Sequence, residues 1–556
     1  MAAIITDQIR ILNAKNFLSG VTSASNSYYS FVGLPNPTSI KSDWNTTPPS
    51  PLDNFDNENN TWDSIIALKK ITSNDVRQVV RKIEWSSGRT YDYYRHDYSI
   101  SNIPKNSSGT SLYSANYYVV NSDYRVYICL QNGTTPETPD GKPSLDEPTF
   151  TDLEPRSAGS SGDGYIWKYL YTINASDIIK FESTDFIPVP LNWETNQNDA
   201  VVRDNAVDGS IKIVVITDRG VGLGTANRTY TKVPIKGDGT GAECTIVINN
   251  DQKVESVTVS NQGSGYTYGN IDLVAGNVPT GNSRPTFDVI ISPKGGHGKD
   301  IYRELGASNV MLYSRIENDI ENPDFITGNE IARIGIIENP ISYNSSQLLT
   351  LDKASSVYAL RLTGTGYSSA TFTGDSIITQ TVGTGITAAG KVISYDQTTG
   401  VLKYWQDRTL SGFNTVGTAQ SNPTYGYNLT EFTSSPLAGG SITILGGSVN
   451  LSINTSFTGP STSINNRTYY LGQNFEQGIS TPEVKKYSGN IIYEIIDLPS
   501  RDPPIKKKTS KSYCNSKELC HSKLISIHIL ILMILIQMII TIKFFLNRNI
   551  LFKQEN

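Results

Sequence analysis

Residues 162–173 read GDGYIWKYLYTI, and this stretch decides the fold class. Aromatic and β-branched residues fill it after a glycine-rich start, which is typical of a β-strand that follows a turn. The same aromatic and β-branched residue types occur earlier, in SLYSANYYVVN at residues 111–121 and in YRVYICL at residues 124–130. We therefore predict a mainly β fold, with a β-sandwich core, long loops, few short helices and inserted Gly-rich β domains.

The composition of the whole chain agrees with short strands and many turns. Of 556 residues, 37% are hydrophobic and 18% are charged, against about 45–50% and about 25% in typical globular domains. Glycine (45), proline (26) and tyrosine (31) take their place. The net charge of -5 gives no reason to expect a nucleic-acid partner. The start, MAAIITDQIRILNAKNF, lacks the basic start and the long apolar run of a signal peptide, so we expect synthesis in the cytoplasm.

The N-terminal region mixes helix and strand patterns. TDQIRILNAKNFL at residues 6–18 has apolar residues near helical spacing and predicts a helix. TWDSIIALKKI at residues 61–71 predicts a short helix, and DVRQVVRKIEW at residues 75–85 predicts a strand. Between them, SDWNTTPPSPLDNFDNENN at residues 42–60 contains too many prolines for a strand and predicts an extended arm.

A repeated pattern begins near Ile211. IKIVVITDRGVG (residues 211–222) and VESVTVSNQGSG (residues 254–265) are alternating strands that each end in a Gly-x-Gly turn. A Tyr/Thr-rich stretch, a Gly-rich turn and another strand follow each of them, at residues 244–249 and 287–292. The offset of about 43 residues is within the range of repeated supersecondary units. Two units are too few for a solenoid, so we predict a small inserted β domain.

The rest of the chain contains a second all-β block. IYRELGASNVMLYSRI at residues 301–316 is helical or mixed, and EIARIGIIENPI at residues 330–341 returns to strand. Residues 348–463 are β-like throughout, and ISYDQTTGVLKYW at residues 393–405 predicts a hairpin. KYSGNIIYEI at residues 486–495 predicts a last strand that returns to the main body.

Two histidines are the main candidates for chemistry. His96 stands beside Asp97, but adjacent residues of a strand point to opposite faces, so we interpret this pair as structural. His297 lies in GGHGKD, whose Gly-Lys pair is typical of phosphate loops. However, Asp300 stands where serine or threonine must hold magnesium, and Pro293 replaces the first glycine. We therefore predict a sharp loop whose glycines adopt positive φ.

Other motifs also fail their context tests. GVGLG at residues 220–224 follows a strand, but no helix start follows it, which excludes a dinucleotide site. Cys129 and Cys244 lie singly in apolar strands and are predicted to be buried thiols, and Cys514 and Cys520 lack metal-site spacing. We predict no catalytic, cofactor-binding or metal-binding residues. Two classes of protein remain: a structural assembly component, or a carbohydrate-binding or carbohydrate-cleaving β protein.

The stretch at residues 162–173 closely resembles a signature of the baseplate wedge protein encoded by gene 8 in T-even-like contractile-tailed phages. YYSFVGLPNPTSIKSDWNTTPPSPLDN, TWDSIIALKKIT and DVRQVVRKIEWSSGRTYDYYRHDYS are similar to the family's opening segments in the same order. SPKGGHGKDIYRELGASNVML and KYSGNIIY resemble later segments of the long marine-phage form. The resemblance covers most of residues 1–205, 290–345 and 465–493.

This resemblance implies a structural role without catalysis or cofactor. It implies a β-sandwich core, a homodimer, and contacts with other baseplate wedge proteins in a virion that assembles in the host cytoplasm. No nucleic acid, small-molecule substrate or membrane is expected as a partner. The GDG segment is then a tight turn and Trp167 a core residue. The predicted organisation is a wedge core at 1–205, a two-repeat insert at 206–295, core at 296–347, a second insert at 348–464, a core strand at 465–494 and a tail at 495–556.

The tail departs from the family near Glu494. When the codons are read with a one-base shift from Ile495, they permit the ending expected of the family, a polar segment and a closing apolar strand, and a stop codon can straddle Ser516 and Lys517. The same shift turns polar codons into Ile and Met codons, which accounts for HILILMILIQMIITIKFFL after Ser526–Ile527. About 20 apolar residues can span a bilayer, but Lys543 and the family context oppose an anchor. We predict that residues 495–556 are an out-of-frame tail, and that residues 505–556 leave the body as a loose tail or a lone helix with few contacts to the β core.

Overall fold

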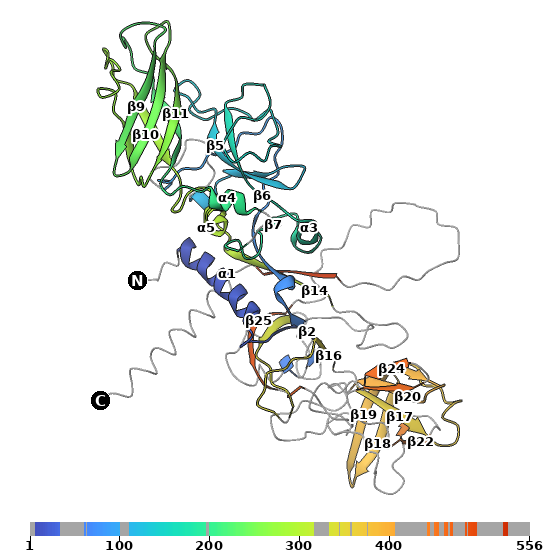
Figure 1. The fold of residues 1–556 in the computed structure, drawn as a ribbon. Helices are drawn as coiled ribbons and strands as arrows, with labels where there is room; N and C mark the ends of the chain where they lie inside the picture. Colours follow the sequence, from blue (N-terminus) through green and yellow to red (C-terminus); the bar gives the residue numbers. More distant parts are fainter. Residues whose placement is uncertain are drawn as a thin grey trace, which may run out of the picture. The chain divides into compact units, whose positions relative to one another are not determined.

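The computed structural model describes a mainly β protein with few short helices, as predicted (Figure 1). Its described residues are 6–33, 61–62, 64–99, 111–195, 199–315, 333–343, 345–355, 358–374, 376–405, 442–444, 450–454, 461–464, 467–470, 484–485, 487–496 and 526–531. The predicted Pro-rich arm at 42–60 and both Cys514 and Cys520 lie outside them.

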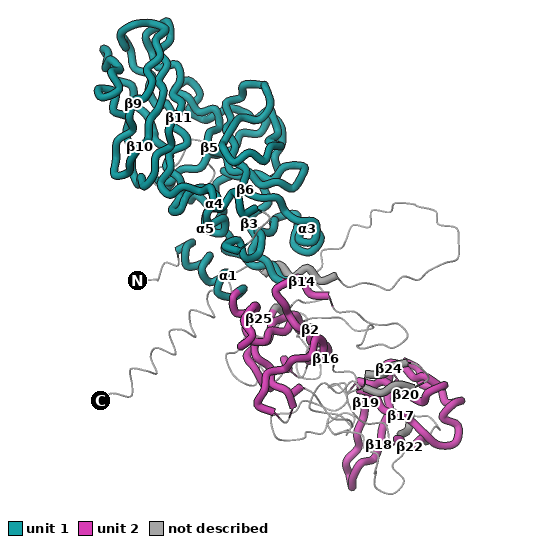
Figure 2. The backbone as a smooth tube through the Cα atoms, in the orientation of Figure 1, with its two compact units in different colours: residues 1–18, 76–312, 530–533 teal, residues 19–75, 313–529, 534–556 magenta. Residues whose placement is uncertain are grey.

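The chain divides into two compact units, each built from separate segments (Figure 2). Unit 1 contains residues 1–18, 76–312 and 530–533, and unit 2 contains residues 19–75, 313–529 and 534–556. The finer domain boundaries proposed from the sequence remain predictions.

The main core of unit 1 is aromatic and surrounds a three-stranded antiparallel sheet. Its strands are β4 (Tyr118–Val120), β5 (Arg125–Asn132) and β6 (Tyr165–Thr172), in the order β4-β5-β6. β5 and β6 have almost no exposed residues, because side chains on both faces are buried. A second sheet has the order β26-β14-β3-β7, with β3 (Val76–Arg81), β7 (Phe186–Pro188), β14 (Asn309–Arg315) and β26 (Ser526–Ile531).

The repeats form the Gly-rich part of unit 1, with three strands in each repeat. The first supplies β8 (Ile211–Asp218), β9 (Thr229–Gly237) and β10 (Thr240–Ile248), and the second supplies β11 (Val254–Ser264), β12 (Gly269–Ile271) and β13 (Thr286–Ile291). The strands of the two repeats pair in reverse order: β8 pairs with β13, β9 with β12 and β10 with β11. The same β9 also pairs with β10, which gives a sheet in the order β11-β10-β9-β12.

The two-stranded ribbon β8-β13 lies between two hydrophobic cores. Ile211, Val214 and Ile291 belong to a core made only of residues 211–291. Ile213 and Ile290 belong to the large aromatic core instead. The repeat region therefore has a core of its own. The large aromatic core of unit 1 covers the other face of its ribbon.

Four α-helices occur in the described residues: α1 (Asp7–Thr22), α3 (Ala175–Phe181), α4 (Ala200–Asp204) and α5 (Ile301–Leu305). Short 3-10 turns cover Ser73–Asp75 and Leu112–Ser114. The first helix was predicted, and its buried residues Ile11, Ala14, Leu18 and Val21 follow a helical stripe. The mixed prediction for residues 301–316 is also confirmed, because α5 is followed by β14.

A five-stranded antiparallel sheet in unit 2 joins segments that are far apart in the sequence. Its order is β16-β2-β1-β15-β25, with β1 (Tyr28–Gly33), β2 (Ile65–Ile71), β15 (Arg333–Glu338), β16 (Lys353–Ser355) and β25 (Asn490–Ile496). β25 is the predicted returning strand. Tyr29, Phe31, Trp62 and Leu68 contribute to the core of this sheet.

The helix predicted over residues 61–71 is wrong for most of its length, because Ile65–Ile71 is strand β2. β2 pairs with β1 on one side and β16 on the other. Its first four residues are all buried, and so short an apolar run has the same pattern in a buried strand as in a helix. Pairing with distant strands decides between them.

The second β block contains a closed barrel with the order β17-β20-β19-β18-β21-β22. The strands are β17 (Tyr358–Thr363), β18 (Ile377–Gly383), β19 (Ile386–Asp396), β20 (Val401–Trp405), β21 (Ile442–Ile444) and β22 (Asn450–Ile453). The predicted hairpin is β19-β20. In the part of the chain that the structure describes, the barrel core is built from residues 358–453. A separate hairpin joins β23 (Ser461–Ile464) and β24 (Arg467–Tyr470).

The predicted tail lies largely outside the described residues. Ile495 and Ile496, which were assigned to it, continue β25 and pair with Ile334 and Arg333. Residues 526–531, where we expected a loose tail or a lone helix, form strand β26 beside β14 instead. Among the described residues, no helix is long and apolar enough to cross a membrane.

Candidate functional site

The loop around His297 is a structural turn, as predicted. Gly295, Gly296 and Gly298 have φ values of 87°, 96° and 88°, a region that glycine adopts without strain. A Cβ atom on Gly296 would lie 2.5 Å from the backbone nitrogen of Val207. The glycines therefore allow both the left-handed backbone and its close approach to the segment after α4.

His297 forms a buried pair with Glu304 on α5. Its Nδ1 lies 2.6 Å from Oε1 of Glu304, and the Gly298 N–H donates to Oε2 at 2.7 Å. Asp300, which breaks the phosphate-loop pattern, caps α5 by accepting the Arg303 N–H at 3.1 Å. The Trp193 indole N–H donates to the Gly298 carbonyl at 2.9 Å.

A histidine–carboxylate pair is the arrangement used for general-base catalysis. Here His297 is 5% exposed and Glu304 is 3% exposed, so a substrate cannot reach either side chain. The ring of Tyr94 also contacts the imidazole edge-on, with centroids 4.9 Å apart. We therefore interpret the pair as a clamp that holds the glycine loop onto α5.

His96 and Asp97 have different partners. The Nδ1 of His96 accepts the Ile291 N–H at 3.3 Å, and burial lowers the pKa of His96. Asp97 accepts two hydrogen bonds of 3.0 Å from Arg95. Burial alone would raise the pKa of Asp97, but the Arg95 hydrogen bonds and charge bring it below the ordinary value. These contacts support the structural interpretation of the pair.

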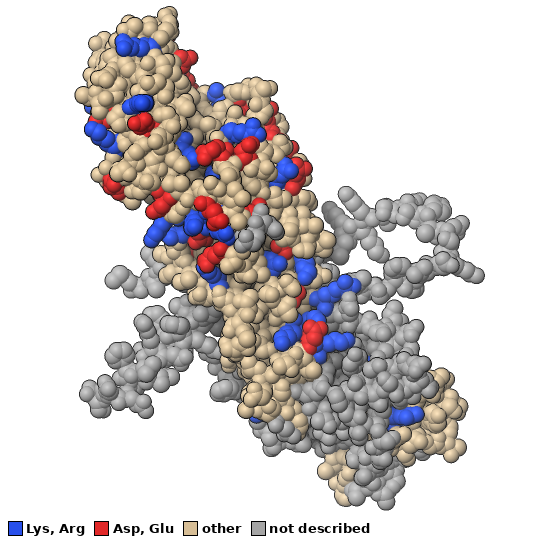
Figure 3. All heavy atoms as spheres, in the orientation of Figure 1, with Lys and Arg blue, Asp and Glu red and all other residues tan. Residues whose placement is uncertain are grey.

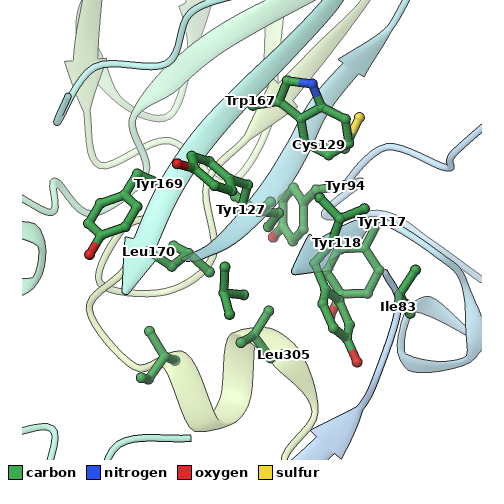
Figure 4. Close-up of a cluster of buried hydrophobic side chains, with 14 of the residues drawn as sticks. Ile83, Tyr94, Tyr117, Tyr118, Tyr127, Cys129, Trp167, Tyr169, Leu170 and Leu305 are labelled. Atoms are coloured by element: carbon green, nitrogen blue, oxygen red, sulfur yellow. The ribbon is translucent and has the colours of Figure 1, made fainter. Parts of the chain in front are cut away.

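The GDG segment is a tight turn and Trp167 is a core residue, as expected. Gly162 and Gly164 have φ values of 68° and 85°, and Asp163 accepts the N–H groups of Leu145 and Tyr165. Trp167 is fully buried and stacks on Tyr165 with centroids 5.3 Å apart. Figure 4 shows Trp167 and neighbouring tyrosines in this core. The signature residues thus form the fold rather than a site.

The two described cysteines are buried thiols, as predicted. Burial raises the pKa of Cys129, and it raises the pKa of Cys244 to about 12. A neutral thiol is a poor nucleophile and metal ligand. Within the described residues, no cluster of three or more His, Cys, Asp or Glu side chains could hold a metal ion.

Two hollows lined by described residues of unit 1 are further candidates. One has a volume of about 490 Å³ and is lined by residues that include Arg81, Lys82 and Phe186. Its Lys82 ammonium is already paired with Glu84 and Glu182 at 2.6 and 2.5 Å, and the Arg81 guanidinium donates to the Ala115 carbonyl at 2.7 Å. The other has a volume of about 470 Å³ and lies between β11, the ribbon strand β8 and the β5-β6 sheet. Sequence patterns did not indicate either hollow, because each is formed by segments that are distant in the chain.

The visible surface of unit 1 has basic and acidic side chains intermixed rather than gathered by sign (Figure 3). No protein-family model matches the chain, and no curated protein matches it. The function therefore rests on the residues themselves.

Proposed function

We propose that this chain is a structural component of a phage tail baseplate wedge and acts in virion assembly through protein–protein contacts. The observation that carries the proposal is the GDGYIWKYLYTI signature together with the flanking segments that follow in the family's order. The glycines of the signature form a turn and its tryptophan is buried in the core. Such structural roles are expected of the signature residues in a protein without catalysis.

The local chemistry is compatible with this role. The histidines of the described core are occupied by structural contacts, His297 with Glu304 and His96 with the Ile291 N–H. On the face of unit 1 that Figure 3 shows, the charges are intermixed and give no single-sign field of the kind that attracts nucleic acid. We propose a homodimer that binds neighbouring wedge proteins, without a small-molecule substrate, cofactor or membrane.

The test combines the purified full-length chain with the neighbouring wedge proteins of the same phage. Light scattering after size-exclusion chromatography should give a dimer alone and a complex of fixed stoichiometry in the mixture. A parallel assay measures the release of reducing ends from host-surface polysaccharide. A monomer that binds none of the wedge proteins, or a chain that cleaves polysaccharide, would overturn the proposal.

The C-terminal tail belongs to the same proposal. Glu494 contributes to unit 2 through Arg333, and the sequence departs from the family near this residue, so the proposed tail begins at Ile495. We propose that it is read out of frame, and resequencing of the locus decides. An intact frame, with the chain recovered in a membrane fraction, would make the tail an anchor instead.

A further inference from the structure

Strand β11 has an unusually exposed free edge. It is 11 residues long and pairs with β10, which leaves its other edge at the end of the sheet. Among the described residues, the main chain of residues 257–262 forms no hydrogen bond beyond this β10 ladder. The opposite end of the same sheet is β12, with only three residues. Short edge strands are a common protection against unwanted pairing, and β11 lacks it.

The sequence of β11 also lacks most other protections. VESVTVSNQGS contains no lysine, arginine or proline, and its one charged residue, Glu255, lies near its start. The strand has a bulge where Cys244 and Glu243 pair with Val259 and Asn261. Proteins usually block exposed edges with charged residues or proline. At its start the edge is covered, because the main chain of Val254 and Glu255 is hydrogen-bonded to Arg219. The unblocked edge at residues 257–262 favours a partner that completes the sheet.

The free edge opens into the hollow of about 470 Å³. Residues 257–262 form one wall, residues 212–214 of β8 form part of the lining, and Gln131, Glu154, Pro155 and Ile166 line the rest. One residue of an added strand needs about 3.3 Å along the strand, about 4.8 Å across and about 10 Å between faces, or about 160 Å³. The hollow therefore accommodates about three residues.

The lining determines the chemistry of the occupant. Lys212 and Glu154 are the charged residues of the lining, and they pair with each other at 2.5 Å. An uncharged segment therefore fits better than an acidic or basic one. Among the described residues, no aromatic side chain lines the hollow, although stacking on aromatic rings is a frequent means of binding sugars. Main-chain hydrogen bonds to an edge strand are instead the basis of peptide binding by strand addition.

We propose that the hollow beside β11 binds an uncharged, extended segment of a partner polypeptide, which adds a short strand to the free edge at residues 257–262. Main-chain hydrogen bonds to β11 hold the segment, and Thr258 and Ser260, both exposed, lie along it. This inference needs only the described geometry and does not depend on the baseplate role.

The experiment uses the immobilised full-length chain and a displayed library of random octapeptides. An enriched peptide is synthesised, and its affinity is measured by fluorescence polarisation. Ser260→Lys and Thr258→Lys place a long charged side chain at the edge and should each weaken binding by about tenfold or more. Thr231→Lys, at an exposed position of the inner strand β9, is the matched control and should bind like the parent chain.

A second measurement protects the test against variants that fold poorly. Amide hydrogen exchange of residues 257–262 in the unmodified chain should slow when the peptide is added, while β9 remains unchanged. Enriched peptides that bind all variants equally, or no enrichment, would overturn the proposal. Self-association that Ser260→Lys abolishes would assign the edge to a second copy, and oligosaccharide binding lost in the same variant would assign it to a glycan; either result overturns the peptide proposal.

Discussion

Replacement of Glu494 by alanine should loosen the five-stranded sheet of unit 2. Glu494 lies on β25, and its Oε1 accepts a 2.7 Å hydrogen bond from Nη1 of Arg333 on β15. The Arg333 side chain is 0% exposed, and that of Glu494 is 14% exposed. Thr61 accepts a further hydrogen bond from the same Nη1 at 2.8 Å. The carboxylate is therefore a charged partner of a fully buried guanidinium.

The magnitude follows from the burial of the arginine. Removing one partner of a buried ion pair costs about 3–5 kcal/mol. Because Glu494 is slightly exposed and water can partly replace its carboxylate, we expect about 3 kcal/mol, near the lower limit of that range. Burial lowers the pKa of Arg333, and Glu494 opposes this change. At 1.36 kcal/mol for each factor of ten, the loss corresponds to roughly 150-fold more frequent opening.

Amide hydrogen exchange with mass spectrometry measures this opening in the β15 peptide, residues 333–338. The matched control is Asp352→Ala, which removes a mostly exposed carboxylate paired with Lys69 on β2 of the same sheet and should cost less than about 1 kcal/mol. The double variant Arg333→Met with Glu494→Leu removes both charges and should recover most of the protection. A rise below about fivefold for Glu494→Ala, or an equal effect of the control, would refute the reasoning.

Three further predictions concern the turn, the thiols and the barrel. Gly164→Ala should destabilise unit 1 by about 2 kcal/mol or more in urea unfolding, because its Cβ would lie 2.7 Å from the Cα of Gly133. Gly162→Ala, with open space around it, should cost about half as much. Equal losses in the two variants would contradict this prediction. Cys129 and Cys244 should resist iodoacetamide at neutral pH until urea unfolds the chain, and rapid labelling of the folded chain would be inconsistent with their burial. Burial raises both thiol pKa values. The stability that the neutral thiols contribute is therefore full below the ordinary thiol pKa and should fall as the pH rises above about 9. Excised residues 348–464 should unfold cooperatively by circular dichroism, because the barrel core lies within them, and a fragment without a protease-resistant core would argue against an independent domain.

The parts of the fold that depend on local sequence could be predicted. The hairpin β19-β20, the glycine turn around His297 and the buried Trp167 each follow from residues within a short window. Strand β2 could not, because its apolar run suits a helix equally well until β1 and β16 are known to lie on either side of it.

The candidate sites show the same limit more strongly. Arg333 and Glu494 are 161 residues apart, and Arg333 and Thr61 are 272 apart, so no local pattern marks them as partners. The free edge of β11 is harder still to predict, since it depends on which other strands fail to cover it. Alternation along VESVTVSNQGS indicates a strand but cannot indicate how many neighbours that strand has.

The wide sequence separation of the strands in unit 2 has a consequence for its biosynthesis. β1 ends at Gly33, and its partner β15 begins at Arg333, so about 300 residues must be translated between them. At a rate of 5–20 residues per second, β1 waits about 15–60 s for that neighbour, and β25 emerges later still. The strands between Ile211 and Ile291 emerge within about 4–16 s at the same rates. The repeat region therefore emerges as a complete unit within seconds, whereas β1, which can pair early with the nearby β2, keeps its other edge uncovered until β15 is made.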